Sequence, residues 1–271
     1  MKKHSNTLIS VLATWFISAT LFLAVLGLAE WLTVNAVSPN IISVIRGVLL
    51  SILFASLAWV MVRNGENPFK TIGLNTWSKN LTYFGLGLGL LLVPLLLTIF
   101  FSNLAGWASY QLNQNSAIVE RQLLVLLVVF LFEAFPEEII FRGVIFGKLA
   151  AKYNKWKSSI ITVALFVLFP IFVFPIQKLF MSGPIVIGGN EGITIGYLIY
   201  MTIFGFFTAG LRVFTKNIWT SIGFHLLFVS MNHLMGIHNK GLIVITDYSN
   251  ELSIQLIFLV SLILMGSILY W

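Results

Sequence analysis

The chain has no cysteine and very little charge. Its 271 residues include 16 Lys and Arg and only 9 Asp and Glu, so charged residues make up 9% of the sequence. A typical soluble domain has about 25% charged residues. Without cysteine, disulfide bonds, thiolate catalysis and cysteine-ligated metal sites are excluded. With 58% hydrophobic residues and a mean hydropathy of +0.96, the composition is typical of a protein embedded in a lipid bilayer.

Apolar stretches of about 20 residues, the length that crosses ~30 Å of hydrocarbon, recur along the chain. They predict an all-α polytopic bundle of about eight transmembrane helices, in one integral-membrane domain covering residues 1–271. The polar segments 102–121 and 236–251 are expected to be loops, and 212–217 a tight basic loop. The expected spans are residues 7–29, 41–62, 81–101, 122–148, 158–180, 192–211, 218–235 and 252–271.

Basic residues are distributed unequally between the two predicted sides of the membrane. Eleven Lys and Arg fall on the side that holds both termini, and three fall on the other side. Because cytoplasmic loops carry the excess of Lys and Arg, both termini are predicted to be cytoplasmic. The net charge of +7 is therefore explained by membrane topology, with the basic loops facing anionic lipid headgroups. No nucleic-acid partner is predicted.

Glycines are concentrated in the third expected span. Gly85 and Gly89 form a small-xxx-small pattern, which favours close packing of this helix against a neighbour.

The fourth expected span holds three carboxylates and one guanidinium, Glu133, Glu137, Glu138 and Arg142. A charge at bilayer depth costs at least ~2.5–3.5 kcal/mol on insertion scales, so such residues are functional candidates by default. Glu138 and Arg142 are i,i+4 neighbours in the favourable order and can form an internal ion pair. Glu137 has no cationic partner in its own segment, which makes it the candidate general base. The alternative is that these charges only hold neighbouring helices together.

Pro136 lies inside this span and has no backbone N–H. We therefore expect the helix to kink or open one turn earlier, near Phe132. Opened backbone at membrane depth occurs only where protein or trapped water satisfies it, so a hydrated cavity is expected beside Glu137.

The seventh expected span carries His225. Glu138 lies ten residues before Lys148, or ~15 Å along a helix, and His225 lies nine residues after Lys216, or ~13 Å. The two side chains are thus expected at similar depth. The alternative for His225 is a buried histidine bonded to a backbone carbonyl.

The run Pro-Glu-Glu-Ile-Ile-Phe-Arg-Gly at 136–143 resembles the first motif of the CAAX-protease and bacteriocin-processing family, also called the Abi family. The resemblance covers about residues 122–235 and implies an intramembrane endopeptidase. It implies that Glu137 activates water, that Glu138 and Arg142 support the site, and that His225 serves as the oxyanion or proton partner. Auxiliary candidates are Glu133, Asn232 and His233.

The chain departs from that family's other two motifs. The Phe-x-x-x-His motif reads Phe166 to Pro170, and the His-x-x-x-Asn motif reads His225 to Val229. A missing oxyanion donor can cost ~10²–10³ in rate, and missing acid–base help ~10²–10⁴. Enzyme activity is therefore left open. The alternative is a catalytically inactive relative that binds membrane peptides, for bacteriocin self-immunity or regulation of a membrane partner. A small transporter is a third hypothesis, which the absence of an internal repeat disfavours.

The cofactor prediction has two forms. Glu137, Glu138 and His225 would supply the three protein ligands of a zinc ion, or the reaction would proceed by metal-free activation of water. The predicted partners are the lipid bilayer and a membrane-associated peptide or protein substrate. The resemblance implies a multi-pass protein of the bacterial cytoplasmic membrane.

Overall fold

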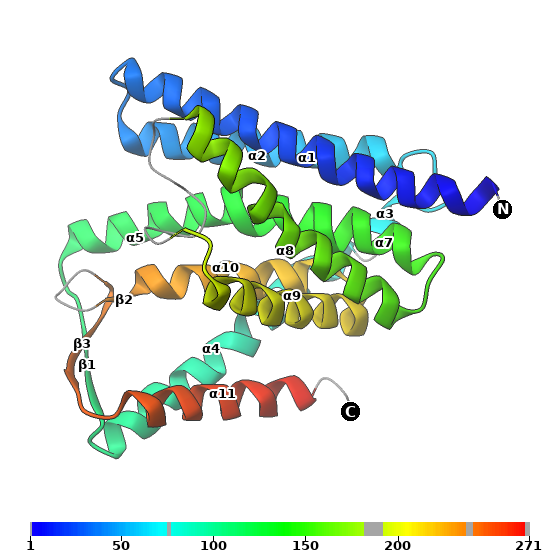
Figure 1. Cartoon of the computed structure of the whole chain (residues 1–271). Helices are drawn as coiled ribbons and strands as arrows, with labels where there is room; N and C mark the ends of the chain where they lie inside the picture. Colours follow the sequence, from blue (N-terminus) through cyan, green and yellow to red (C-terminus); the bar gives the residue numbers. More distant parts are fainter. Residues whose placement is uncertain (1, 75–76, 182–191, 237–240, 269–271) are drawn as a thin grey trace.

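The chain forms a bundle of long helices with a small β-sheet at one end, in a computed structural model that describes residues 2–74, 77–181, 192–236 and 241–268 (Figure 1). The elements in chain order are α1 (Lys2–Val34), α2 (Pro39–Val62), α3 (Pro68–Ile72), η1 (Trp77–Lys79), α4 (Asn80–Leu104), β1 (Ala108–Leu112), α5 (Ser116–Val129), η2 (Phe130–Ala134), α6 (Phe135–Glu138), η3 (Ile139–Ile145), α7 (Phe146–Ala150), α8 (Lys155–Phe180), α9 (Ile195–Thr215), α10 (Ile218–Leu234), β2 (Met235–Gly236), β3 (Ile243–Tyr248) and α11 (Glu251–Ile268).

The centre of the bundle is the continuous helical run from α5 to α7, in which η2 and η3 are π-helical. Figure 1 shows α1 and α2 on one side of this run, α9 and α10 on the other, and α4 and α11 beyond them. All seven residues of η3 are buried, so the central run is covered from every side at that level. The acidic stretch therefore lies in the middle of the bundle.

Five helices among the described residues are long and apolar enough to cross a membrane, and α10 and α11 contain shorter apolar segments. The all-α membrane bundle is confirmed in class. Eight spans and cytoplasmic termini remain predictions. The five helical stretches are Thr7–Val34, Pro39–Val62, Asn80–Leu104, Lys155–Phe180 and Ile195–Thr215.

Two of the expected loops contain regular structure, so those predictions are wrong in part. β1 pairs antiparallel with β3, and β3 pairs in parallel with β2. α5 begins at Ser116, where the side chain of Asn115 caps it by accepting a hydrogen bond from the Ala117 amide. The sheet joins segments that are more than 100 residues apart in the sequence. This pairing provides hydrogen-bond partners for backbone N–H and C=O groups that have none within their own short segment.

Glycines bring α4 and α10 into close contact, but not the glycines expected from the sequence. A Cβ atom added at Gly85 or Gly89 would meet nothing within 4 Å, so the packing prediction for this pair is wrong. A Cβ at Gly87 would lie 2.1 Å from the Thr220 carbonyl oxygen, and one at Gly223 would lie 2.3 Å from the Phe84 carbonyl oxygen. The two backbones meet at Gly87 and Gly223, which fixes α10 two residues before His225.

Candidate active site

The π turn η2 opens the central helix directly before Pro136. The amide of Phe135 donates to the carbonyl of Phe130, five residues back, rather than to that of Leu131. The carbonyl of Leu131 instead accepts a hydrogen bond from the Ser51 hydroxyl of α2 at 2.5 Å. The predicted opening near Phe132 is thus confirmed, in the form of a π turn, a feature frequent at functional sites.

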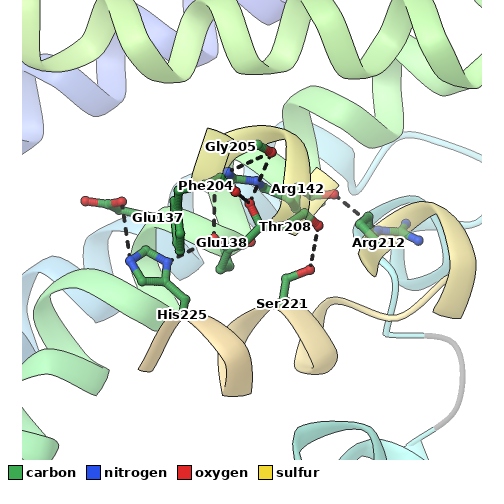
Figure 2. A network of polar contacts seen from close by, with 9 residues as sticks. All are labelled: Glu137, Glu138, Arg142, Phe204, Gly205, Thr208, Arg212, Ser221 and His225. Atoms are coloured by element: carbon green, nitrogen blue, oxygen red, sulfur yellow. Dashed lines mark hydrogen bonds and ion pairs between the residues drawn. The ribbon is translucent and has the colours of Figure 1, made fainter. Parts of the chain in front are cut away.

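Glu138 and Arg142 form the ion pair that their spacing predicted. Oε1 of Glu138 lies 3.1 Å from Nη1 of Arg142, and both side chains are fully buried. Nη2 of Arg142 also donates to the carbonyl of Gly205 on α9 at 3.4 Å (Figure 2). Its guanidinium lies 4.3 Å from the centre of the Phe166 ring. A buried arginine is stable only where such partners surround it, so these contacts fix both the charge and its orientation.

His225 connects α10 to both glutamates (Figure 2). Its Nδ1 lies 3.0 Å from Oε1 of Glu138, and an ionised carboxylate only accepts hydrogen bonds, so Nδ1 carries a proton. Its Nε2 faces Oε2 of Glu137 at 4.0 Å. The ring packs edge-on against Phe204, with centroids 4.7 Å apart. The predicted matching depth of Glu138 and His225 is confirmed, and the alternative in which Nδ1 bonds a backbone carbonyl is wrong.

Glu137 is the accessible member of the cluster. Its side chain is 24% exposed, whereas those of Glu138 and His225 are 0% and 3% exposed. A separation of 4.0 Å between Glu137 and His225 is too long for a direct hydrogen bond, but it allows one water molecule to bond to both. The geometry therefore provides a position for a water molecule between an accessible carboxylate and an oriented imidazole.

The three auxiliary candidates differ in placement. Glu133 is half-buried and lies within electrostatic range of Glu137, His225, His233 and Arg46. His233 is exposed, and the side chain of Asn232 lies outside the described part of the structure. Glu133 is thus the auxiliary candidate that extends the site along the central helix.

Arg212 is a site residue that the sequence reasoning missed. It was expected in a loop, but α9 continues to Thr215 and Arg212 is only 7% exposed. Its Nε donates to the Arg142 carbonyl and its Nη2 to the Thr71 carbonyl, each at 3.2 Å. Gly73, at a φ of +89°, leaves room for it, since a Cβ there would lie 2.7 Å from the guanidinium carbon. Thr208 and Arg212 are i,i+4 neighbours. This polar pair at the end of an apolar span is the sequence feature that could have indicated a buried Arg212.

The two motif positions that depart from the family pattern bring no polar group. Pro170 is buried in α8 and Val229 is half-buried in α10. From α8 it is Phe166 that reaches the cluster, under the guanidinium of Arg142. The candidate site therefore consists of Glu137, Glu138, Arg142 and His225, and α8 contributes the ring of Phe166 but no polar side chain at position 170.

The donor set does not fit a zinc ion. Nδ1 of His225 and Arg142 both contact the same oxygen of Glu138, so these groups are directed at one another and not at a shared point. Within the described ranges, no group of three His, Asp or Glu side chains is arranged to hold a metal. The predicted set Glu137, Glu138 and His225 is thus not supported as a metal centre.

The fold and this cluster together define an integral membrane protein with a polar site inside its helical bundle. Residues 119–231 match the family model Type II CAAX prenyl endopeptidase Rce1-like. This match confirms the resemblance to the CAAX-protease family, with bounds close to the expected 122–235. The match includes all four residues of the cluster and about two fifths of the chain. No curated protein and no solved structure matches the chain.

Proposed function

We propose that the chain is an intramembrane endopeptidase that hydrolyses a peptide bond of a membrane-associated substrate. The observation that carries this proposal is the pair of facing groups on Glu137 and His225, 4.0 Å apart, with His225 oriented from its other side by Glu138. A histidine whose second nitrogen is held by a carboxylate is the arrangement that fixes ring orientation for catalysis. The Rce1-like match of residues 119–231 supports the same reaction class.

In the proposed reaction, Glu137 accepts a proton from the water molecule that it shares with His225. The water oxygen then bonds to the carbon of the scissile carbonyl, whose oxygen becomes an oxyanion. In its form protonated on both nitrogens, His225 would donate a hydrogen bond from Nε2 to that oxyanion and keep its proton throughout. Glu137 returns its proton to the amide nitrogen as the C–N bond breaks, so one water molecule yields one carboxyl and one amino terminus.

The buried charges of this arrangement are paired. The carboxylate of Glu138 lies 3.1 Å from the guanidinium of Arg142, and both side chains are fully buried. Such pairing offsets the several kcal/mol that an isolated buried ion costs. In this proposal Arg142 stabilises the buried carboxylate of Glu138 and does not contact the substrate.

The test is Glu137→Gln, which keeps the size of the side chain and removes the base. We expect hydrolysis to fall by about 10²–10⁴-fold, the range for lost acid–base help. The measurement compares the termini of membrane peptides between membranes carrying the native protein and the variant at matched expression. Glu120→Gln, an exposed glutamate at the start of the same helical run, is the control and should change nothing. If the product termini are unchanged in Glu137→Gln, the proposed endopeptidase activity is wrong.

A second candidate function is an inactive relative that binds membrane peptides. The observation that favours it is the apolar character of positions 170 and 229, where the family motifs place polar side chains. If motif decay limits the activity, Pro170→His should increase cleavage by about 10²-fold or more, the lower end of the range for acid–base help. Pro175→His in the same helix is the matched control. Equal activity of the two variants would count against motif decay as the limit.

A further inference from the structure

An apolar cleft lies beside the bundle core, between α8, α9 and α11, and none of the four cluster residues lines it. Its volume is about 1110 Å³. Phe206, Phe207 and Gly210 line it from α9, and Ile263 lines it from α11. Small-molecule sites commonly enclose ~300–1,000 Å³, so the cleft has room for a large, extended apolar ligand.

The cleft is polar and basic only at the end formed by the start of α8. Asn154, Lys155 and Trp156 line it there, and Trp156 is 72% exposed. Exposed tryptophan at the end of a membrane helix is typical of the level of the lipid headgroups. The apolar part of the cleft therefore lies at the level of acyl chains, directly below.

The sequence that forms α8 and α9, the two walls at this end, carries nearly all of its charge as lysine and arginine. Lys152 and Lys157 flank Lys155, and between Arg142 and Lys216 the sequence has a single acidic residue, Glu191. Among the described residues, Lys155 takes part in no salt bridge. Lys157 instead packs over the ring of Tyr153 at 4.6 Å, which leaves Lys155 as the lysine that lines the cleft. The mouth of the cleft thus favours an anion.

We propose that this cleft is a binding site for one anionic phospholipid. The phosphate contacts Lys155 beside Trp156, and an acyl chain extends along Phe206 and Gly210. A basic mouth above an apolar cleft between membrane helices matches the recognition of anionic lipid headgroups, and the lysine contributes attraction that a zwitterionic lipid lacks. The lipid comes from the leaflet that adjoins the loop between α7 and α8.

The same helix forms one wall of the cleft and one wall of the polar site. Phe207 lines the cleft and stacks on Phe224 with centroids 4.5 Å apart, next to His225. On the other face of α9, Gly205 accepts from Arg142. A lipid in the cleft therefore supports α9 from behind, although its binding requires no catalytic activity and the proposal stands apart from the proposed function.

The experiment measures lipid retained by the detergent-purified protein in native mass spectrometry, after addition of phosphatidylglycerol or phosphatidylcholine. Lys155→Gln should reduce retained phosphatidylglycerol roughly fivefold, the effect of one lysine at an anionic surface. Lys178→Gln removes the same charge from the other end of α8 and should retain lipid as the native protein does. Gly210→Leu fills the cleft and should abolish retention, whereas Gly89→Leu, where an added Cβ meets nothing within 4 Å, should not.

Native-like retention of phosphatidylglycerol in Lys155→Gln would overturn the proposal, because this exposed residue can change without affecting folding. Equal retention of phosphatidylcholine would do the same. Displacement of the phospholipid by a prenylated peptide, one for one, would assign the cleft to a substrate's lipid chain instead. Selective loss in Lys155→Gln and Gly210→Leu, with both controls unchanged, is the result that supports the proposal.

Discussion

Two adjacent glutamates of the central helix have opposite environments. Glu138 is fully buried, and one of its oxygens contacts both Arg142 and His225. Glu137 is 24% exposed, and its Oε2 lies 4.0 Å from Nε2 of His225. Consecutive residues of a helix point in directions about 100° apart. One of these two carboxylates therefore lies inside the ion-pair network, and the other lies at its accessible edge. The comparison separates a buried glutamate that holds the ion-pair network together from an accessible glutamate, which is the general base of the proposed reaction.

The largest effect on stability is expected for Glu138→Gln. It leaves the buried Arg142 without its carboxylate, and breaking a buried pair typically costs about 3–5 kcal/mol. Glu137→Gln should cost less than about 1 kcal/mol, since it breaks no direct contact. Unfolding in detergent, followed by the loss of helical signal, measures both. Equal destabilisation by the two variants would contradict the division between the glutamates.

A smaller effect is expected for Arg212→Met, which removes the donors to the Arg142 and Thr71 carbonyls. Hydrogen bonds from charged groups contribute about 1.5–3 kcal/mol, so the variant should lose stability in that range. Lys178→Met, which removes an exposed charge from α8, is the control for the change of net charge. If Arg212→Met is as stable as this control, Arg212 does not support the buried end of the network.

The smallest effect is expected for Ser51→Ala, which removes the hydrogen bond to the Leu131 carbonyl in the π turn η2. Side-chain hydrogen bonds between membrane helices average about 0.6 kcal/mol, and we expect a loss of that size. The control is Ser43→Ala on the same helix, whose hydroxyl donates to the Pro39 carbonyl of its own turn. If the two variants unfold with the same free energy, the hydrogen bond from α2 to the Leu131 carbonyl does not stabilise the protein.

Local rules predicted the parts of the site that depend on one helix. The ion pair of Glu138 and Arg142 could be predicted because i,i+4 side chains on one helix lie close together whatever surrounds the helix. The opening of the helix before Pro136 could be predicted because proline has no backbone N–H in any context. The depth of His225 followed from counting residues along a straight helix. Together with composition, these rules gave the all-α membrane class and the ion pair.

The remaining features depend on contacts between distant segments. Arg212 was assigned to a loop because a lysine and an arginine close to an apolar run usually mark its end, yet carbonyl groups from two other elements bury it. Gly87, not Gly85 or Gly89, meets α10 because the packing face is set by the partner helix. The sheet of β1 and β3 joins segments that carry no local signal of each other.

The two π-helical segments have a consequence for how this chain tolerates insertions and deletions. A turn closed by an i→i+5 bond holds one more residue than an α-helical turn. Loss of a single residue from 130–134 would let that turn close as ordinary helix and would leave the helices on its two sides in nearly their present relative rotation. Loss of a single residue from the α-helical stretch Ser116–Val129 would instead rotate everything on one side of it by about 100°. The π turn is thus the part of this helical run where a one-codon deletion should be found more often among functional copies.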